Sequence, residues 1–132
     1  MRIQVKDFMS TPVITAVAEN KVSETMALMK EKGIHAVPII SYPRDNPEAE
    51  MTIQGIFTTS DISEEVNKNT TVQDVMTNSN VHVVHVNSSA NSAAKMMLKH
   101  EVHYIVVMDD GKIKGMISAM DFVKLVTEYT LD

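Results

Sequence analysis

The stretch Gly55-Ile-Phe-Thr-Thr-Ser-Asp61-Ile decides the fold, because it recurs as Gly115-Met-Ile-Ser-Ala-Met-Asp121-Phe. Both stretches hold a glycine, two apolar residues, a hydroxyl residue and then an aspartate three positions later. Each has the pattern of a strand that ends where a helix begins. A motif that recurs with its internal spacing intact indicates an internal duplication.

The duplication extends towards the N-terminus of each copy. Val5-Lys-Asp-Phe-Met-Ser matches Val72-Gln-Asp-Val-Met-Thr 67 residues later, and residues 29–35 match residues 97–103 at a distance of 68. We call Val5–Ser10 and Val72–Thr77 the lead-in segments. We place the two copies at residues 1–67 and 68–132.

The two copies differ in one loop. The closing motifs lie only 60 residues apart, so the first copy carries an insertion of eight residues, which falls within residues 41–50. Its proline, aspartate and asparagine content predicts an exposed hairpin loop. The second copy has the short turn Asp109-Asp110-Gly111-Lys112 instead, and Asp-Gly between apolar runs is a strong hairpin signal.

Each copy is predicted to be a β-α-β-β-α unit, so the fold class is α/β (α+β) with two packed repeats. Residues 13–17 and 81–86 are β-branched runs suited to strands. Two hairpins then follow, one of residues 37–40 with 53–57 and one of residues 104–108 with 113–117, and each leads into a final helix near its aspartate.

An apolar stripe with helical spacing follows each first strand. In the first copy Val22, Met26 and Met29 form it, with Asn20 as the expected N-cap and Gly33 as the C-terminal stop. In the second copy the stripe consists of Ala90, Ala94, Met97 and Leu98. These methionines are predicted to fill the core, since Trp is absent and Met occurs 11 times.

Composition excludes several classes of protein. With 12 basic and 17 acidic residues the net charge is −5, so we expect no nucleic acid partner. The absence of cysteine excludes disulfides and zinc-thiolate sites and fits a reducing compartment, so we expect a cytoplasmic protein. No apolar run approaches the about 18 residues of a membrane span, and no signal-peptide pattern opens the chain.

The recurring motif suits a nucleoside. An aspartate carboxylate can accept hydrogen bonds from both vicinal hydroxyls of a ribose, and the amides of a helix N-terminus favour an anionic phosphate. A second interpretation is purely structural: Ser60 caps a helix and Asp61 improves its dipole. The motif alone leaves both open.

Taken together, the lead-in segments, the His-x-Val-Pro strand and the paired closing motifs resemble a tandem pair of cystathionine β-synthase (CBS) domains, a Bateman module. The resemblance covers nearly the whole chain. It implies a pseudo-two-fold pair of repeats with two clefts that bind AMP, ADP, ATP or S-adenosylmethionine, with no cofactor required. It also implies a homodimer.

Carried over to this sequence, the resemblance assigns the ligand-binding residues. Asp61 and Asp121 would hold ribose hydroxyls, and Thr58 and Ser118 would lie near the ribose or phosphate. The segment before the first strand of the other repeat would bracket the adenine. These segments are Ser79, Asn80 and Val81 for Asp61, and Pro12, Val13 and Ile14 for Asp121.

The phosphate end of the site departs from the family pattern. His35 and His103 occupy a position that can reach phosphates in nucleotide-binding relatives. Where those relatives often have an arginine next, this chain has Ala36 and Tyr104. Because bidentate phosphate recognition is a property of arginine, the departure favours AMP or a less anionic adenosyl compound.

No metal site is predicted, although His82 and His85, like His100 and His103, have spacings seen at metal sites. Residues three apart on a strand point to opposite faces, so His82 and His85 would not chelate one ion.

Two functions remain open. The first is a non-catalytic sensor that binds an adenine-containing small molecule and regulates an enzyme or transporter. The alternative is an interaction or dimerisation module with empty clefts, which the missing arginine supports. No constellation of residues indicates an enzyme, and we expect no membrane contact.

Overall fold

The computed structural model describes residues 2–41, 51–61, 67, 69–78 and 81–128. The chain divides into two compact units: unit 1 consists of Met1–Val13 with His82–Asp132, and unit 2 consists of Ile14–Val81. Unit 1 thus joins the beginning of the chain to the second copy of the repeat. The boundary between the sequence copies at 67 and 68 stays a prediction.

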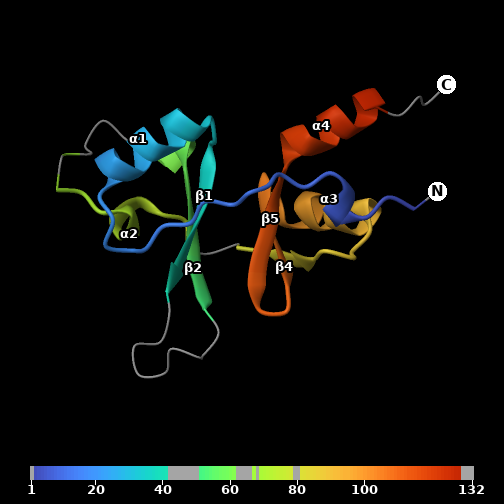
Figure 1. Cartoon of the computed structure of the whole chain (residues 1–132), viewed down its shortest axis with the longest axis horizontal. Helices are drawn as coiled ribbons and strands as arrows, with labels where there is room; N and C mark the ends of the chain where they lie inside the picture. The colour runs from blue at the N-terminus through green and yellow to red at the C-terminus, as the bar shows by residue number, and fades with distance from the viewer. Residues whose placement is uncertain (1, 42–50, 62–66, 68, 79–80, 129–132) are drawn as a thin grey trace. The chain divides into compact units, whose positions relative to one another are not determined.

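Unit 2 is built on one antiparallel hairpin (Figure 1). Its elements are α1 (Val22–Lys32), β1 (Ala36–Ser41), β2 (Thr52–Thr58), the 3-10 helix η2 (Thr59–Asp61) and α2 (Val72–Val75). The helix α1 ends at Gly33, whose φ of 67° is a left-handed conformation that glycine adopts without strain. The predicted stop signal is confirmed.

Unit 1 has a three-stranded sheet in the order β3-β4-β5, with β3 parallel and β5 antiparallel to β4. Its elements are the 3-10 helix η1 (Val5–Asp7), β3 (Val83–His85), α3 (Ala90–His100), β4 (Tyr104–Asp109), β5 (Lys112–Ser118) and α4 (Ala119–Glu128). The mixed helices and strands confirm the predicted fold class.

The two hairpins have the same register. Ile39 lies opposite Gly55 in unit 2, and Val107 lies opposite Gly115 in unit 1. In both, the pairing shifts at the residue after this pair, between Ile39 and Ile40 and between Val107 and Met108. The structures of the hairpins therefore match residue for residue outside the insertion, whose residues 42–50 lie outside the described ranges.

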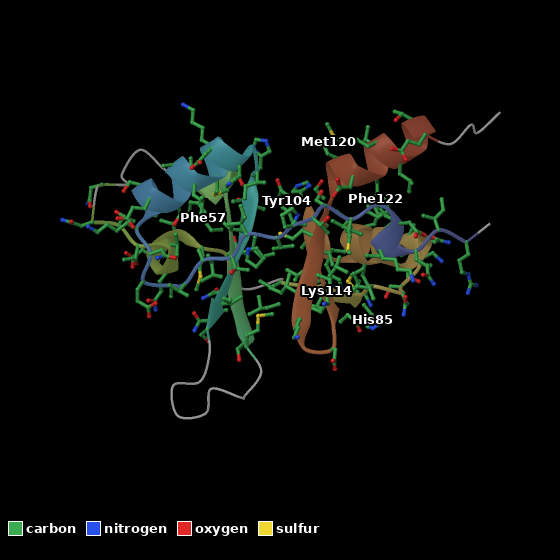
Figure 2. All side chains as sticks on the ribbon, viewed as in Figure 1. Phe57, His85, Tyr104, Lys114, Met120 and Phe122 are labelled. Atoms are coloured by element: carbon green, nitrogen blue, oxygen red, sulfur yellow. The ribbon has the colours of Figure 1, made fainter. Side chains whose placement is uncertain are left out.

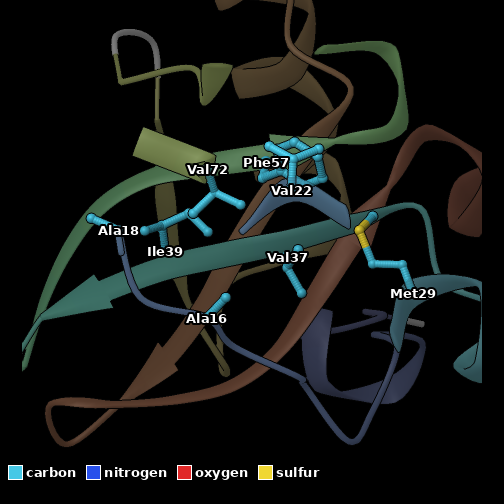
Figure 3. Packing of buried hydrophobic residues seen from close by; sticks show 8 residues of the cluster. All are labelled: Ala16, Ala18, Val22, Met29, Val37, Ile39, Phe57 and Val72. Atoms are coloured by element: carbon cyan, nitrogen blue, oxygen red, sulfur yellow. The ribbon is translucent and has the colours of Figure 1, made fainter. Parts of the chain in front are cut away.

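Each unit has its own apolar core, and the lead-in segment of one copy completes the core of the other. In unit 2 the core (Figure 3) includes Val72, which is 0% exposed. In unit 1 it includes Val5, also 0% exposed, and Phe8 stacks edge-on against Phe122 of α4 with ring centroids 5.0 Å apart. The lead-in segments are exchanged between the copies.

Two predicted details of the first strands and helices are wrong. Of the strand predicted over 13–17, one parallel bridge between Ala16 and Ile39 is formed. The Val17 N–H donates instead to Asn20 Oδ1 at 2.9 Å, which turns the chain. The side chain of Asn20 is thus used before the helix, and the N-cap is Lys21.

The helix stripes are confirmed in unit 2 and corrected in unit 1. Val22 and Met29 are buried, and Met26 packs against the same core. In α3, however, Leu98 is 81% exposed, and Ala93 is buried with Met97. The prediction for Met97 is therefore confirmed, whereas that for Leu98 is wrong and Ala93 belongs to the buried face in its place.

Of the two final helices, α4 is confirmed. At the first closing motif the structure describes the 3-10 helix η2, and the predicted helix beyond Asp61 lies outside the described residues. Within the part of the chain that the structure describes, each helix is too short or too polar to cross a membrane.

Candidate functional site

The recurring motif of unit 1 lies at the junction of β5 and α4. Ser118 and Asp121 bind each other's backbone across the first turn: Ser118 N–H donates to Asp121 Oδ2 at 2.9 Å, and Asp121 N–H donates to Ser118 Oγ at 3.2 Å. This reciprocal pair satisfies two amides that a helix N-terminus leaves unpaired. Asp121 thus has a structural role at the helix N-terminus, but the capping hydroxyl is that of Ser118, which corresponds to Thr58 and not to Ser60.

The Asp121 carboxylate has a second partner, from the lead-in segment of the first copy. Ser10 Oγ–H donates to both carboxylate oxygens, at 3.1 Å from Oδ1 and 3.2 Å from Oδ2. The backbone holds this serine in place, because Ser10 and Met116 exchange N–H···O=C bonds of 2.8 and 3.1 Å. Asp121 is only 7% exposed, whereas Ser10 is exposed.

Tyr104, labelled in Figure 2, is the first residue of β4 and lies opposite Ser118 in the hairpin. It is close enough to Asp121 for the charge of that carboxylate to act on its phenol. Burial, and secondly the negative charge of Asp121, raise the pKa of Tyr104 above its ordinary value of 10.0. Tyr104 is therefore a neutral phenol at physiological pH. It offers a hydroxyl and an aromatic face at the start of β4.

In unit 2 the corresponding junction is described only in part. Thr58 Oγ1 and Ser60 Oγ lie 2.8 Å apart and share a hydrogen bond. The side chain of Asp61, as well as Ser79 and Asn80, lies outside the described residues. Their predicted roles stay predictions.

The remaining predicted residues are divided between the units. Pro12 and Val13 belong to the same unit as Asp121, whereas Ile14 and Val81 belong to unit 2 with Thr58. The segment that ends at Val13 thus lies in the same unit as the closing motif of the second copy. The segment that ends at Val81 lies in the same unit as the closing motif of the first copy. Their assignment to adenine binding stays a prediction.

His35 and His103 play matching backbone roles. The carbonyl of His35 accepts from Thr59 N–H, and that of His103 accepts from Ala119 N–H, at 3.1 and 3.0 Å. Both side chains are exposed. Their predicted reach towards a phosphate stays a prediction.

Ser10 is the site residue that the sequence analysis missed. A signal was present: Ser10 ends the first lead-in segment, and Thr77 occupies the same place in the second. A hydroxyl residue at both ends indicates a shared role. What the sequence did not show is that this residue meets the aspartate of the other copy.

The histidines of unit 1 have separate partners. His85 Nε2 lies 3.0 Å from Asp109 Oδ1, while the ring of His82 stacks on His100 with centroids 3.8 Å apart. Across the described ranges, no three His, Cys, Asp or Glu side chains gather closely enough to hold a metal ion.

A sequence model of the CBS domain matches residues 5–68 and again residues 72–128. The chain belongs to the CBS domain family. CBS domain pairs are regulatory modules, and the two matched stretches make this chain such a pair.

Inosine-5'-monophosphate dehydrogenase of Staphylococcus aureus is a curated relative, 32% identical over 108 residues. The match covers 82% of this chain but only 21% of the dehydrogenase. The chain therefore spans about a fifth of the length of this relative.

Solved structures agree on the fold. The CBS domain pair of the protein MJ0100, determined with 5'-methylthioadenosine and S-adenosyl-L-methionine, has a TM-score of 0.79 at 24% identity, with 97% of this chain and 98% of that chain covered. The CBS domain of a bacterial CNNM/CorC family Mg2+ transporter, in complex with an inhibitor, has a TM-score of 0.76 at 22% identity, with 98% and 79% covered.

Proposed function

We propose that this CBS domain pair is a ligand-sensing regulatory module that binds an adenosyl compound through the vicinal hydroxyls of its ribose. The observation that carries the proposal is the Asp121 carboxylate, which is 7% exposed and lies at the N-terminus of a ten-residue helix. Two oxygens held at a fixed place match the two hydroxyls of a ribose.

The surroundings of Asp121 favour a ligand with little phosphate charge. Tyr104, whose phenol is neutral, interacts with the Asp121 carboxylate, and the chain as a whole carries a net charge of −5. Neither supplies the positive charge that holds a di- or triphosphate. AMP, S-adenosylmethionine and 5'-methylthioadenosine are therefore preferred over ADP and ATP.

The comparisons support the same class of ligand. One structural relative is a complex with 5'-methylthioadenosine and S-adenosyl-L-methionine. Other relatives are a dehydrogenase and a Mg2+ transporter, so an enzyme or transporter is the kind of partner that we propose for the regulation. We place this function in the cytoplasm.

Calorimetric titration of the whole chain tests the proposal. AMP, S-adenosylmethionine, 5'-methylthioadenosine, ADP and ATP are each added, and adenosine is compared with 2',3'-dideoxyadenosine. We expect binding that the dideoxy compound loses, because it lacks both hydroxyls. Binding of none of these compounds at millimolar concentration contradicts the proposal.

A matched pair of variants locates the site. Asp121→Asn keeps the shape of the side chain and removes the charge, and we expect a loss of about ten- to a hundredfold in affinity. Asp110→Asn is the control, because Asp110 lies in an exposed turn at φ 52°, a conformation that asparagine tolerates. Equal affinity in the wild type and Asp121→Asn contradicts the role of Asp121; Asp61→Asn tests the other copy.

A second function, homodimerisation, is favoured by an apolar stripe on α4. Met120, which Figure 2 labels on α4, is 62% exposed, and Val123 and Val126 are 55% and 53% exposed. Their spacing of three residues places them near one another on the helix. Burying such a stripe against a second copy would remove it from water. Light scattering should give twice the 14.7 kDa of one chain, and Val123→Glu should reduce this to the monomer.

A further inference from the structure

The bond between Ser10 and Asp121 has a feature that a structural hydrogen bond does not need: it engages both carboxylate oxygens. A carboxylate has about four lone-pair positions. Ser118 N–H takes one on Oδ2, and Ser10 Oγ–H is shared between Oδ1 and Oδ2. Ser10 therefore stands where the hydroxyls of a ribose would have to bind.

The position of Ser10 lets its side chain leave without disturbing the fold. Its backbone is fixed by the bridge to Met116, while the residue itself is exposed. The cores of both units are formed by other residues, among them Val5 of the same lead-in segment. Rotation about one side-chain bond is enough to free the carboxylate.

Once Ser10 has turned away, Asp121 stays in place. The carboxylate is still held by Ser118 N–H at 2.9 Å, and the Asp121 backbone still donates to Ser118 Oγ. The lone pairs that Ser10 gives up, one on Oδ1 and one on Oδ2, fit the two donors of a vicinal diol.

We propose that Ser10 is a latch: its hydroxyl occupies the Asp121 carboxylate in the free protein, must be displaced by the ligand's diol, and so sets the affinity and specificity of the site. The inference rests on the proposed function and adds a regulatory residue from the other copy. A compound with a single ribose hydroxyl should bind more weakly, because it can replace the serine hydroxyl on only one of the two carboxylate oxygens of Asp121.

The latch predicts opposite changes in stability and affinity for one substitution. Ser10→Ala removes the bond in the free protein, so the melting temperature falls by about 3 °C. The ligand no longer has to displace a competitor, so its affinity rises about tenfold. A residue with a merely structural role would lower the stability without tightening the binding.

The experiment measures the dissociation constants of adenosine and 5'-methylthioadenosine by calorimetry, and the melting temperature, for the wild type and three variants. Ser10→Thr keeps the hydroxyl, as Thr77 does in the other copy, and should retain wild-type affinity. Ser23→Ala removes an exposed serine hydroxyl from α1 and should change neither value by much. Ser10→Ala should bind adenosine and 5'-methylthioadenosine about ten times more tightly than the wild type and the other two variants do.

The possible outcomes separate the latch from the proposed function. Tighter binding by Ser10→Ala, or binding by this variant alone, supports the latch. If the wild type binds and Ser10→Ala binds equally or more weakly, the latch is overturned while the proposed function stands. If none of the variants binds either compound, the proposed function has failed and the latch with it.

Discussion

Gly55 and Gly115 hold the same position in two hairpins of equal register, but different neighbours explain why each is glycine. A Cβ at Gly55 would lie 2.6 Å from the backbone oxygen of Thr77, whereas a Cβ at Gly115 would first meet the side chain of Met9, with Sδ at 2.6 Å. In both, the lead-in segment of the other copy passes directly over the glycine. Both copies therefore have the same crossing of a lead-in segment over a glycine. They differ in how readily the segment can make room for a larger residue at that glycine.

The largest expected effect comes from this difference. Gly55→Ala should lower the free energy of unfolding by about 3 kcal/mol, because a backbone carbonyl must move, and Gly115→Ala by about 1 kcal/mol, because a methionine side chain adapts. Urea denaturation of both variants measures this. Equal losses would show that the main chain at Ser10, whose oxygen lies 3.0 Å from the added Cβ, limits unit 1 as well.

Because the lead-in segments are exchanged between the copies, shortening the buried valine of each segment should lower the free energy of unfolding by a similar amount. Val5→Ala and Val72→Ala each empty part of a core in which the valine is fully buried, so each should cost about 2 kcal/mol. Val17→Ala, in the segment before α1 where the valine is 38% exposed, is the control and should cost little. A negligible loss in either buried variant would contradict the exchange of the segments.

The ends of α1 and α3 give a third, smaller contrast. Gly33 and Glu101 cap them in the same left-handed conformation, at φ 67° and 54°. Only glycine adopts it without strain, so Glu101→Gly should stabilise the chain by up to about 1 kcal/mol and Gly33→Ala should destabilise it by about 1 kcal/mol. Thermal unfolding checks both, and a loss of stability in Glu101→Gly would contradict the argument.

The smallest effect is a dependence on pH that comes from the stacked pair of His82 and His100 in unit 1. His100 stacks on His82, and loss of hydration, the charge of His82 and that of Lys99 lower its pKa below the ordinary value of 6.5. The first copy has Ile14 and Lys32 at the corresponding positions, so it lacks this pair.

The sign follows from proton uptake. Between pH 6.5 and the lower pKa of the folded state, the unfolded chain binds more protons at His100 than the folded chain does. Stability is therefore complete above about pH 6.5 and decreases as the pH falls through this window. His100→Gln should flatten this part of the stability curve, and an unchanged curve would contradict the assignment.

Much of the fold was predictable from the sequence. The repeat fixed the order of elements, the hairpins, the stop at Gly33 and the helix that begins at the second closing motif. The predictions failed where the signal was local and weak. Asn20 has the chemistry of an N-cap but bonds Val17 instead, and the stripe with Leu98 depended on a choice between adjacent helix faces.

The sequence by itself determined the duplication and the aspartate with its hydroxyl residue three positions before it, since both are patterns of spacing along the chain. Only the tertiary structure decided that Ser10 binds Asp121, 111 residues away. That contact arises because the lead-in segment of one copy crosses the last strand of the other, where Gly115 leaves room for it. Spacing encodes local geometry, but the partners of a buried carboxylate depend on which distant segments the packing brings beside it.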